Sequence, residues 1–175
     1  MRILVLAPLI ALAACVRPSA PPPAPAPVRP APAPTPAPPP TPAPLSSDWR
    51  DWPITPGTWS YRADPRGSVA LFGEPGSEAR LTLRCDRQAG RVYLSRAGDG
   101  PASSMTVRTT STTRALPVRP VQGATPYIAA ELGPRDPLLD AMAFSRGRFI
   151  VETAGLPYLA VPAWAEVARV TEDCR

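Results

Sequence analysis

The 175-residue chain contains no histidine and no lysine, and it has only three cysteines. Without histidine, the usual Ser-His-Asp and Cys-His catalytic machinery and the usual zinc sites are excluded. Without lysine, Schiff-base chemistry and the phosphate-binding lysine of a P-loop are excluded as well. The sequence therefore predicts no cofactor and no metal site, and it favours a protein that is not an enzyme.

Clustered positive charge is also scarce, although the chain as a whole carries a formal net charge of +5. Residues 46–175 hold 16 arginines and 14 acidic residues, which leaves a net charge of only +2. The arginines are spread along this part of the chain, and no three of them are consecutive. A basic patch is the first requirement for binding a phosphate backbone, so no nucleic-acid partner is expected.

The N-terminus has the pattern of an export signal. Met1-Arg2 supplies a short positive segment, and residues 3–12 are apolar. Ten residues are too few to cross about 30 Å of hydrocarbon as a helix, but they match a secretory signal. The following Leu-Ala-Ala-Cys at 12–15 resembles the lipobox of bacterial lipoproteins. The alternative is a soluble secreted protein cut near Ala14.

The lipobox resemblance implies a signal peptide at residues 1–14, cleavage before Cys15, and lipid on the Cys15 sulfur. Two or three acyl chains hold a protein stably to a membrane, whereas one does so only marginally. In this class an Asp after the cysteine tends to retain proteins at the inner membrane, and here that residue is Val16. We therefore expect a lipid-anchored envelope protein at the outer membrane, facing the periplasm.

Residues 15–45 are expected to form a linker after the lipidated cysteine. Fifteen prolines lie in residues 16–44, mostly alternating with alanine. Proline lacks an N–H and fixes φ, so such a segment favours extended polyproline II at about 3.1 Å per residue. The favoured interpretation is a spacer, and the alternative is a docking peptide for a proline-binding groove.

Residues 46–175 are predicted to form a single globular β-rich domain. Alternating apolar and polar residues, or β-branched enrichment, indicate short strands. One helix is predicted to begin at Asp136-Pro137, with Asp136 as N-cap and Pro137 at the first position, and to end near Gly147. A second is predicted from Pro162 to about Asp173. The fold class is mainly β: an antiparallel sandwich or open barrel, with two short helices and the C-terminal one packed on the sheet. The expected strands are 59–62, 68–72, 78–86, 90–96, 104–110, 127–132, 148–153 and 158–161.

The two cysteines of the domain are predicted to form a disulfide. Cys85 and Cys174 both fall on the inward faces of their expected elements, and export would place them where disulfides persist. A Cys85–Cys174 bond would attach the C-terminal helix to the sheet. The alternative is a pair of buried free thiols.

Two sets of residues are candidate binding groups. Trp49, Trp52 and Trp59 lie close together in sequence, where they could form an exposed platform for a glycan or protein, or instead cover the core. Arg146 and Arg148 flank a glycine at a helix-to-strand corner. They could clamp a carboxylate or phosphate, or instead pair with acidic residues and the helix C-terminus.

Carboxylate-pair chemistry, as in glycosidases, is the one hydrolytic route that the composition leaves open. Glu166, Glu172 and Asp173 could supply a pair, as could Asp136 and Asp140. The alternative is structural: Asp136 caps a helix, and Asp140, Glu166 and Glu172 lie on solvated helix faces.

The tracts DPLLDAMAFSRGRF (136–149) and PAWAEVARVTEDCR (162–175) resemble uncharacterised secreted or lipid-anchored proteins of alphaproteobacteria, whose β-rich domains are similar to the invasion-associated locus B-like proteins. This resemblance implies a β-rich envelope protein and supplies no active site. Three functions follow: a non-catalytic binding or structural lipoprotein with an envelope protein or glycan as partner, an inhibitor or accessory factor of a secreted hydrolase, and a carboxylate-dependent cell-wall hydrolase.

Overall fold

The computed structural model describes residues 45–101 and 103–175. The expected signal peptide, Cys15 and the linker up to residue 44 lie outside these residues. In chain order the elements are η1 (Trp49–Asp51), β1 (Thr58–Asp64), β2 (Gly67–Gly73), β3 (Leu81–Asp86), β4 (Arg91–Ala97), β5 (Ser104–Arg108), β6 (Thr113–Pro117), β7 (Arg119–Val121), β8 (Tyr127–Leu132), α1 (Pro137–Ala143), β9 (Arg148–Thr153), β10 (Leu156–Pro162) and α2 (Ala165–Asp173).

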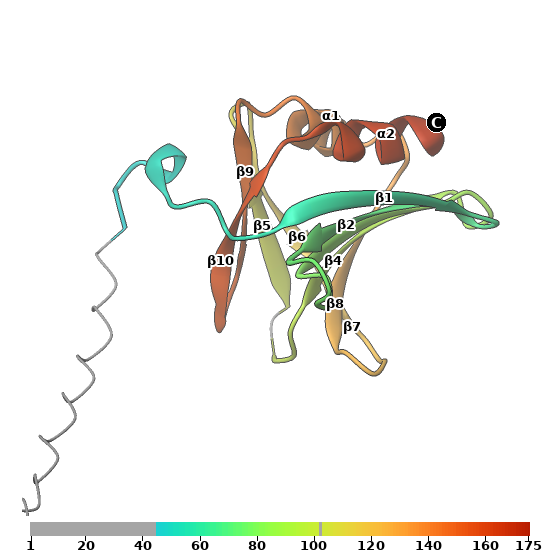
Figure 1. Cartoon of the computed structure of the whole chain (residues 1–175), viewed down its shortest axis with the longest axis horizontal. Helices are drawn as coiled ribbons and strands as arrows, with labels where there is room; N and C mark the ends of the chain where they lie inside the picture. Colours follow the sequence, from blue (N-terminus) through green and yellow to red (C-terminus); the bar gives the residue numbers. More distant parts are fainter. Residues whose placement is uncertain (1–44, 102) are drawn as a thin grey trace, which may run out of the picture. The chain divides into compact units, whose positions relative to one another are not determined.

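The strands form two antiparallel sheets, as shown in Figure 1. The larger sheet has the order β1-β2-β3-β4-β8-β7, and the smaller has the order β10-β9-β5-β6. Helix α2 packs on β1, β2 and β3, and α1 packs beside α2. The predicted fold class is confirmed: a mainly β sandwich with a C-terminal helix on the sheet. Neither sheet closes into a barrel.

Side-chain alternation along the strands decides which face of each sheet is buried. On β3, Leu81, Leu83 and Cys85 are almost fully buried, while Thr82 and Arg84 point to the other face. This is the pattern that the sequence predicts for a strand with one face on the core. Neighbouring strands continue the same inward and outward rows, because pairing in register keeps opposed residues on one face.

The main hydrophobic core lies between the inward faces of the two sheets and the two helices, and a small second cluster groups Trp49 with Ile150 and Ala160. Burying a large apolar side chain contributes about 1.5–3 kcal/mol, so the core supplies the main stabilising free energy. Its largest fully buried side chains include Phe72, Leu81, Leu83, Leu94, Ile128, Met105, Phe149, Leu138, Leu139 and Met142.

Helix α1 begins as its sequence predicts. The Asp136 carboxylate accepts a hydrogen bond from the Leu138 N–H at 2.9 Å, and Pro137 occupies the first turn. The helix ends at Ala143, earlier than expected. Gly147 instead adopts a left-handed conformation, with φ of +77°, in the turn that leads into β9.

Helix α2 begins three residues later than predicted, with Trp164 as its N-cap. Pro162 belongs to β10, where it pairs with Arg148 of β9. Val167 and Val170, three residues apart on one face of the helix, are buried in the core. No helix of residues 45–101 and 103–175 combines the length and the apolar character needed to cross a membrane.

The predicted disulfide between Cys85 and Cys174 is confirmed. It joins β3 to the residue that follows α2, with the two Cα atoms 5.4 Å apart. The last helix is therefore covalently attached to the inward face of the larger sheet.

Two strands, β6 and β7, are absent from the strands predicted from the sequence, and both contain proline. Pro117 ends β6, and Pro120 lies in β7, which pairs with β8. Both strands are at the edge of a sheet, where one side of the backbone needs no ladder partner. Proline is tolerated at such positions because the missing N–H costs no hydrogen bond.

Arg96 is a charged side chain in the interior between the two sheets. It is 3% exposed and donates hydrogen bonds to the carbonyls of Val151 and Pro157. The pairing of β9 and β10 is irregular between Leu156 and Leu159, which leaves the Pro157 carbonyl for this contact. Burial lowers the pKa of Arg96 to about 10.

Candidate functional site

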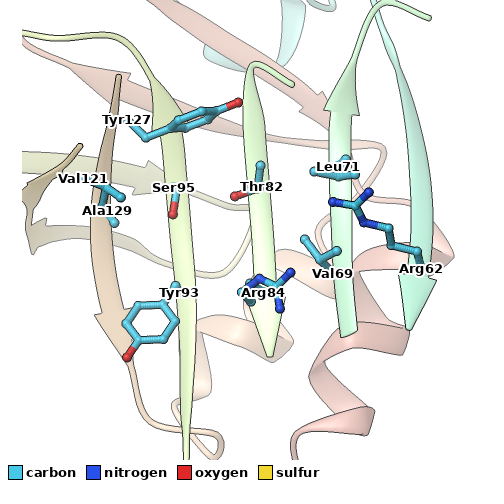
Figure 2. A pocket seen from close by; sticks show the side chains of 10 residues that line it. All are labelled: Arg62, Val69, Leu71, Thr82, Arg84, Tyr93, Ser95, Val121, Tyr127 and Ala129. Carbon is cyan, nitrogen blue, oxygen red and sulfur yellow. The ribbon is translucent and has the colours of Figure 1, made fainter. Parts of the chain in front are cut away.

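The outward face of the larger sheet carries a hollow of about 410 Å³, which we call the sheet groove (Figure 2). All six strands of that sheet contribute to it. The lining residues are Arg62, Val69, Leu71, Thr82, Arg84, Tyr93, Ser95, Val121, Tyr127 and Ala129.

The register of the strands explains why one row of these residues lies together. Arg62 opposes Val69, Val69 opposes Arg84, and Arg84 opposes Tyr93. Four consecutive strands thus place them side by side on the outward face, within contact range of one another.

A second row runs parallel to the first, two residues along each strand. Leu71 opposes Thr82, Thr82 opposes Ser95, and Ser95 opposes Ala129. Figure 2 shows the Thr82 and Ser95 side chains between the two tyrosine rings, which lie toward opposite ends of β4 and β8. Hydroxyl groups and aromatic faces therefore share one surface.

The floor of the groove is apolar and largely shielded from water. Val69 is only 3% exposed although it points away from the core, and Leu71 and Ala129 are half-buried. An outward-facing residue is normally solvated in an antiparallel sheet with one packed face. Such a concave, partly dry surface is typical of a ligand site.

The Arg84 guanidinium lies beside this apolar floor and is held in place by an ion pair. Its Nη2 donates to an Asp64 carboxylate oxygen at 2.8 Å, and about a quarter of each side chain is exposed. The hydrogen bond from Arg84 and the N–H groups of Arg66 and Gly67 hold the pKa of Asp64 below its usual range, against the opposing effect of burial. The Nη1 of Arg84 is buried and has no hydrogen-bond partner among the described residues.

Tyr127 forms one rim of the groove. Its hydroxyl donates to the carbonyl of Ala79 at 2.6 Å, which orients the ring. Burial and the negative charge of Glu78 raise the pKa of Tyr127, so the phenol stays neutral. The ring therefore presents a fixed aromatic surface beside the apolar floor.

The lining combines two guanidinium groups, two aliphatic hydroxyls, two tyrosines and four apolar side chains, with no carboxylate or thiol among the ten residues. Guanidinium groups bind carboxylates with two parallel hydrogen bonds, and tyrosine offers both a flat apolar face and a polar end. The arrangement therefore suits an amphiphilic ligand with an anionic group.

The three tryptophans do not form an exposed platform. Trp49 and Trp59 are buried, at 8% and 6% exposed, and the Trp59 indole N–H donates to the carbonyl of Pro162 at 2.8 Å. Trp52 is half-buried and packs on Tyr158 with ring centroids 4.8 Å apart. Trp59 belongs to the main hydrophobic core, whereas Trp49 and Trp52 pack in a separate small cluster with Ile150, Ala160 and Tyr158, because large apolar rings are stabilised by burial.

The structure does bring Arg146 and Arg148 to one surface, together with Arg50 from η1, around a second hollow. Neither Arg146 nor Arg148 forms an ion pair within residues 45–101 and 103–175, so the expected pairing with acidic residues is not found there.

Two of the carboxylates considered for hydrolysis are committed to structural hydrogen bonds. Asp136 caps α1 and accepts from Arg114 at 2.8 Å. Asp173 accepts from the Tyr61 hydroxyl at 2.7 Å. In both cases burial raises the pKa of the carboxyl, but the hydrogen bonds and nearby arginines outweigh it and lower the pKa. A general acid at neutral pH would need the opposite shift.

The other three carboxylates belong to the helices. Asp140 and Glu172 both pair with Arg175, at 2.8 and 3.2 Å. Glu166 lies in the first turn of α2, where a negative charge favours the helix dipole. None of them lines the sheet groove.

Sequence reasoning missed the sheet groove, although one strand carries a usable signal. Strand β2 carries apolar side chains on both of its faces: Val69 and Leu71 on one, and Ala70 and Phe72 on the other. A strand that is apolar on both faces is unusual in an antiparallel sheet with one solvated side. This pattern indicates a second covered or ligand-facing surface.

The fold and the groove together define a β-sandwich with a ligand-sized hollow on the free face of one sheet. The chain matches no protein-family model, no curated protein and no solved structure. Its function is therefore inferred from the chemistry of the groove and from the residues of the N-terminal signal.

Proposed function

We propose that this protein is a lipid-anchored lipoprotein of the cell envelope whose β-sandwich is a non-catalytic binding domain. In this proposal the sheet groove binds a cell-wall glycan that carries carboxylate groups. The observation that carries the proposal is the exposed Arg62 guanidinium, which lines the sheet groove and forms no ion pair among the described residues. A ligand carboxylate in the groove would accept two parallel hydrogen bonds from this guanidinium.

The proposed location rests on the N-terminal residues and on the cysteine pair. Lipid on Cys15 would attach the protein to the membrane, with the outer membrane and the periplasm as the expected site. The Cys85–Cys174 bond supports export, because disulfides persist in oxidising compartments and are rare in the cytosol.

The ligand class follows from the two rows of the groove. A sugar ring presents an apolar face and a rim of hydroxyls. The tyrosine rings can stack on the apolar face of the sugar, and the Thr82 and Ser95 hydroxyls can hydrogen-bond to its hydroxyl groups. Arg62 adds an exposed positive charge at the β1 side of the groove, so carboxylates on the same chain of sugars would fix its position.

The test is co-sedimentation of the full acylated protein, held in nonionic detergent micelles, with insoluble peptidoglycan sacculi. The wild type should sediment, and Tyr93→Ala and Arg62→Gln should each weaken binding about tenfold, equivalent to about 1.4 kcal/mol. Sacculi with amidated carboxylates should bind less. Arg87→Gln is the matched control, because it removes an exposed arginine from the turn after β3.

Three outcomes would overturn the proposal. The first is the absence of sedimentation, and the second is equal binding by the groove variants and the wild type. The third is release of soluble sugar fragments, which would favour the carboxylate-dependent hydrolase. Stoichiometric capture of a single secreted hydrolase without binding to sacculi would instead favour the inhibitor.

A further inference from the structure

A second hollow, of about 590 Å³, lies where the corner between α1 and β9 meets the turn between β5 and β6 and the short helix η1. We call it the arginine hollow. It is separate from the sheet groove, and the two share no lining residue. Its lining residues are Arg50, Thr110, Ser111, Phe144, Arg146, Gly147 and Arg148.

Positive charge is concentrated in the arginine hollow. Three of its seven residues are arginines, and none is acidic. Arg50 pairs with Asp48 at 3.3 Å, but about half of each side chain is exposed, and an ion pair in water contributes little. Arg146 is exposed and enters no ion pair within the described part of the chain.

Hydrogen bonds hold the corner in place. The Thr110 N–H donates to the Ser145 hydroxyl at 3.1 Å, and the Arg146 N–H donates to the Thr110 hydroxyl at 3.3 Å. The Ser145 hydroxyl in turn donates to the Arg148 carbonyl at 2.5 Å. The left-handed Gly147, with φ of +77°, allows the chain to turn between the two arginines.

Arg148 is further restrained by its own side chain. Its Nη1 donates to the carbonyl of Trp52, and the residue is half-buried. Its other guanidinium N–H groups remain, since a guanidinium has five donors in a fixed plane. A charge held in position in this way binds an anion at a lower entropic cost than a freely rotating side chain.

We propose that the arginine hollow binds a phosphate group. Three guanidiniums and two hydroxyls offer many donors around one space, and phosphate has more acceptor oxygens and more negative charge than a carboxylate. The phosphate could belong to a free phosphorylated molecule or to the head group of an anionic phospholipid. Phe144, which is 74% exposed beside the arginines, has the character of a side chain that enters a lipid interface.

The first experiment measures binding of inorganic phosphate to the full acylated protein in nonionic detergent micelles, at ionic strength held constant with chloride. Binding should be saturable, and Arg50→Gln and Arg146→Gln should each weaken it at least fivefold. Both residues are exposed, so the fold should be kept, which circular dichroism would check. Arg87→Gln is again the matched control and should bind as the wild type does.

Acetate at the same ionic strength should bind more weakly than phosphate. The proposal is overturned if no saturable binding occurs, if acetate binds as tightly, or if all variants bind equally. Sacculus binding should be unaffected by Arg146→Gln, so failure of this site is distinguishable from failure of the sheet groove.

The second experiment identifies the source of the phosphate. The same titration is repeated in micelles that contain phosphatidylglycerol. A head-group ligand would occupy the hollow and weaken the apparent affinity for inorganic phosphate, and Phe144→Ala would reduce this competition. If phosphatidylglycerol causes no competition while inorganic phosphate still binds, the site takes a free phosphorylated molecule.

Discussion

Cys85 and Cys174 join β3, the third strand of the larger sheet, to the end of the chain, across 89 positions of sequence. The neighbouring Asp173 also accepts a hydrogen bond from the Tyr61 hydroxyl of β1. The end of α2 is therefore attached to the sheet at two points. Both contacts reach the face opposite the sheet groove. The structure thus separates a covalently braced inner face from an outer face that is open to a ligand.

Removing the disulfide should destabilise the fold substantially. For a closed loop of about 90 residues, the chain-entropy model gives about 4–5 kcal/mol. The double variant Cys85→Ala and Cys174→Ala should lower the free energy of unfolding by about that amount in urea titrations. Reductant should destabilise the wild type similarly and leave the double variant unchanged. Equal denaturation midpoints for oxidised and reduced wild type would contradict this role.

Gly67 should not tolerate a side chain. It has φ of +149°, and a Cβ there would lie 2.4 Å from the carbonyl oxygen of Cys85 on the paired strand. Gly67→Ala is expected to cost about 3 kcal/mol or more, because either the pairing of β2 with β3 or the backbone must distort. Gly76→Ala is the matched control. Its φ is +79° with open space around it, so it should cost only about 1 kcal/mol.

Acid should destabilise the protein partly through Asp136. The net lowering of its pKa below the ordinary 3.8 means that the unfolded chain binds this proton more readily than the folded one. The stabilising contribution is therefore present above about pH 4 and is lost as pH falls through the folded-state pKa. Asp136→Asn keeps a capping side chain but removes the charge, so it should cost about 1 kcal/mol at pH 7. Unfolding curves between pH 2 and 7 should show a shallower acid dependence for this variant, and parallel profiles would argue against the assignment.

Arg96 should be needed for packing of the two sheets. Arg96→Ala leaves the carbonyls of Val151 and Pro157 without their donor and opens a cavity, so a loss of about 2 kcal/mol or more is expected. Arg96→Met fills most of the space without a charge, and it should recover part of that loss. Arg119→Ala removes an exposed arginine of the edge strand β7 and should be nearly neutral in the same urea titrations. An Arg96→Ala protein as stable as the wild type would refute this role.

Much of the fold could be predicted because local patterns and tertiary packing agree. The alternation around Leu83 identifies a one-sided strand, and Asp136-Pro137 marks a helix start with its own cap. The faces of Val167 and Val170 and the pairing of Cys85 follow from the same periodicities. In each case the deciding interactions lie within a few residues or follow from burial of one face.

The parts that could not be predicted depend on partners distant in sequence. Proline at 162 favours a helix start locally, but pairing with Arg148 extends β10 through it. Pro120 indicates a break, yet an edge position makes it harmless. The sheet groove arises only when rows from six strands align, so no single segment of the sequence contains it.

Three of the four open strand edges carry proline: Pro117 on β6, Pro120 on β7, and Pro157 and Pro162 on β10. β10 is further covered where Thr55 hydrogen-bonds to the backbone of Ala160. An edge strand that lacks a backbone N–H at its prolines pairs poorly with a strand of a neighbouring chain. Neighbouring copies of the protein should therefore have little tendency to pair their sheet edges into fibrils.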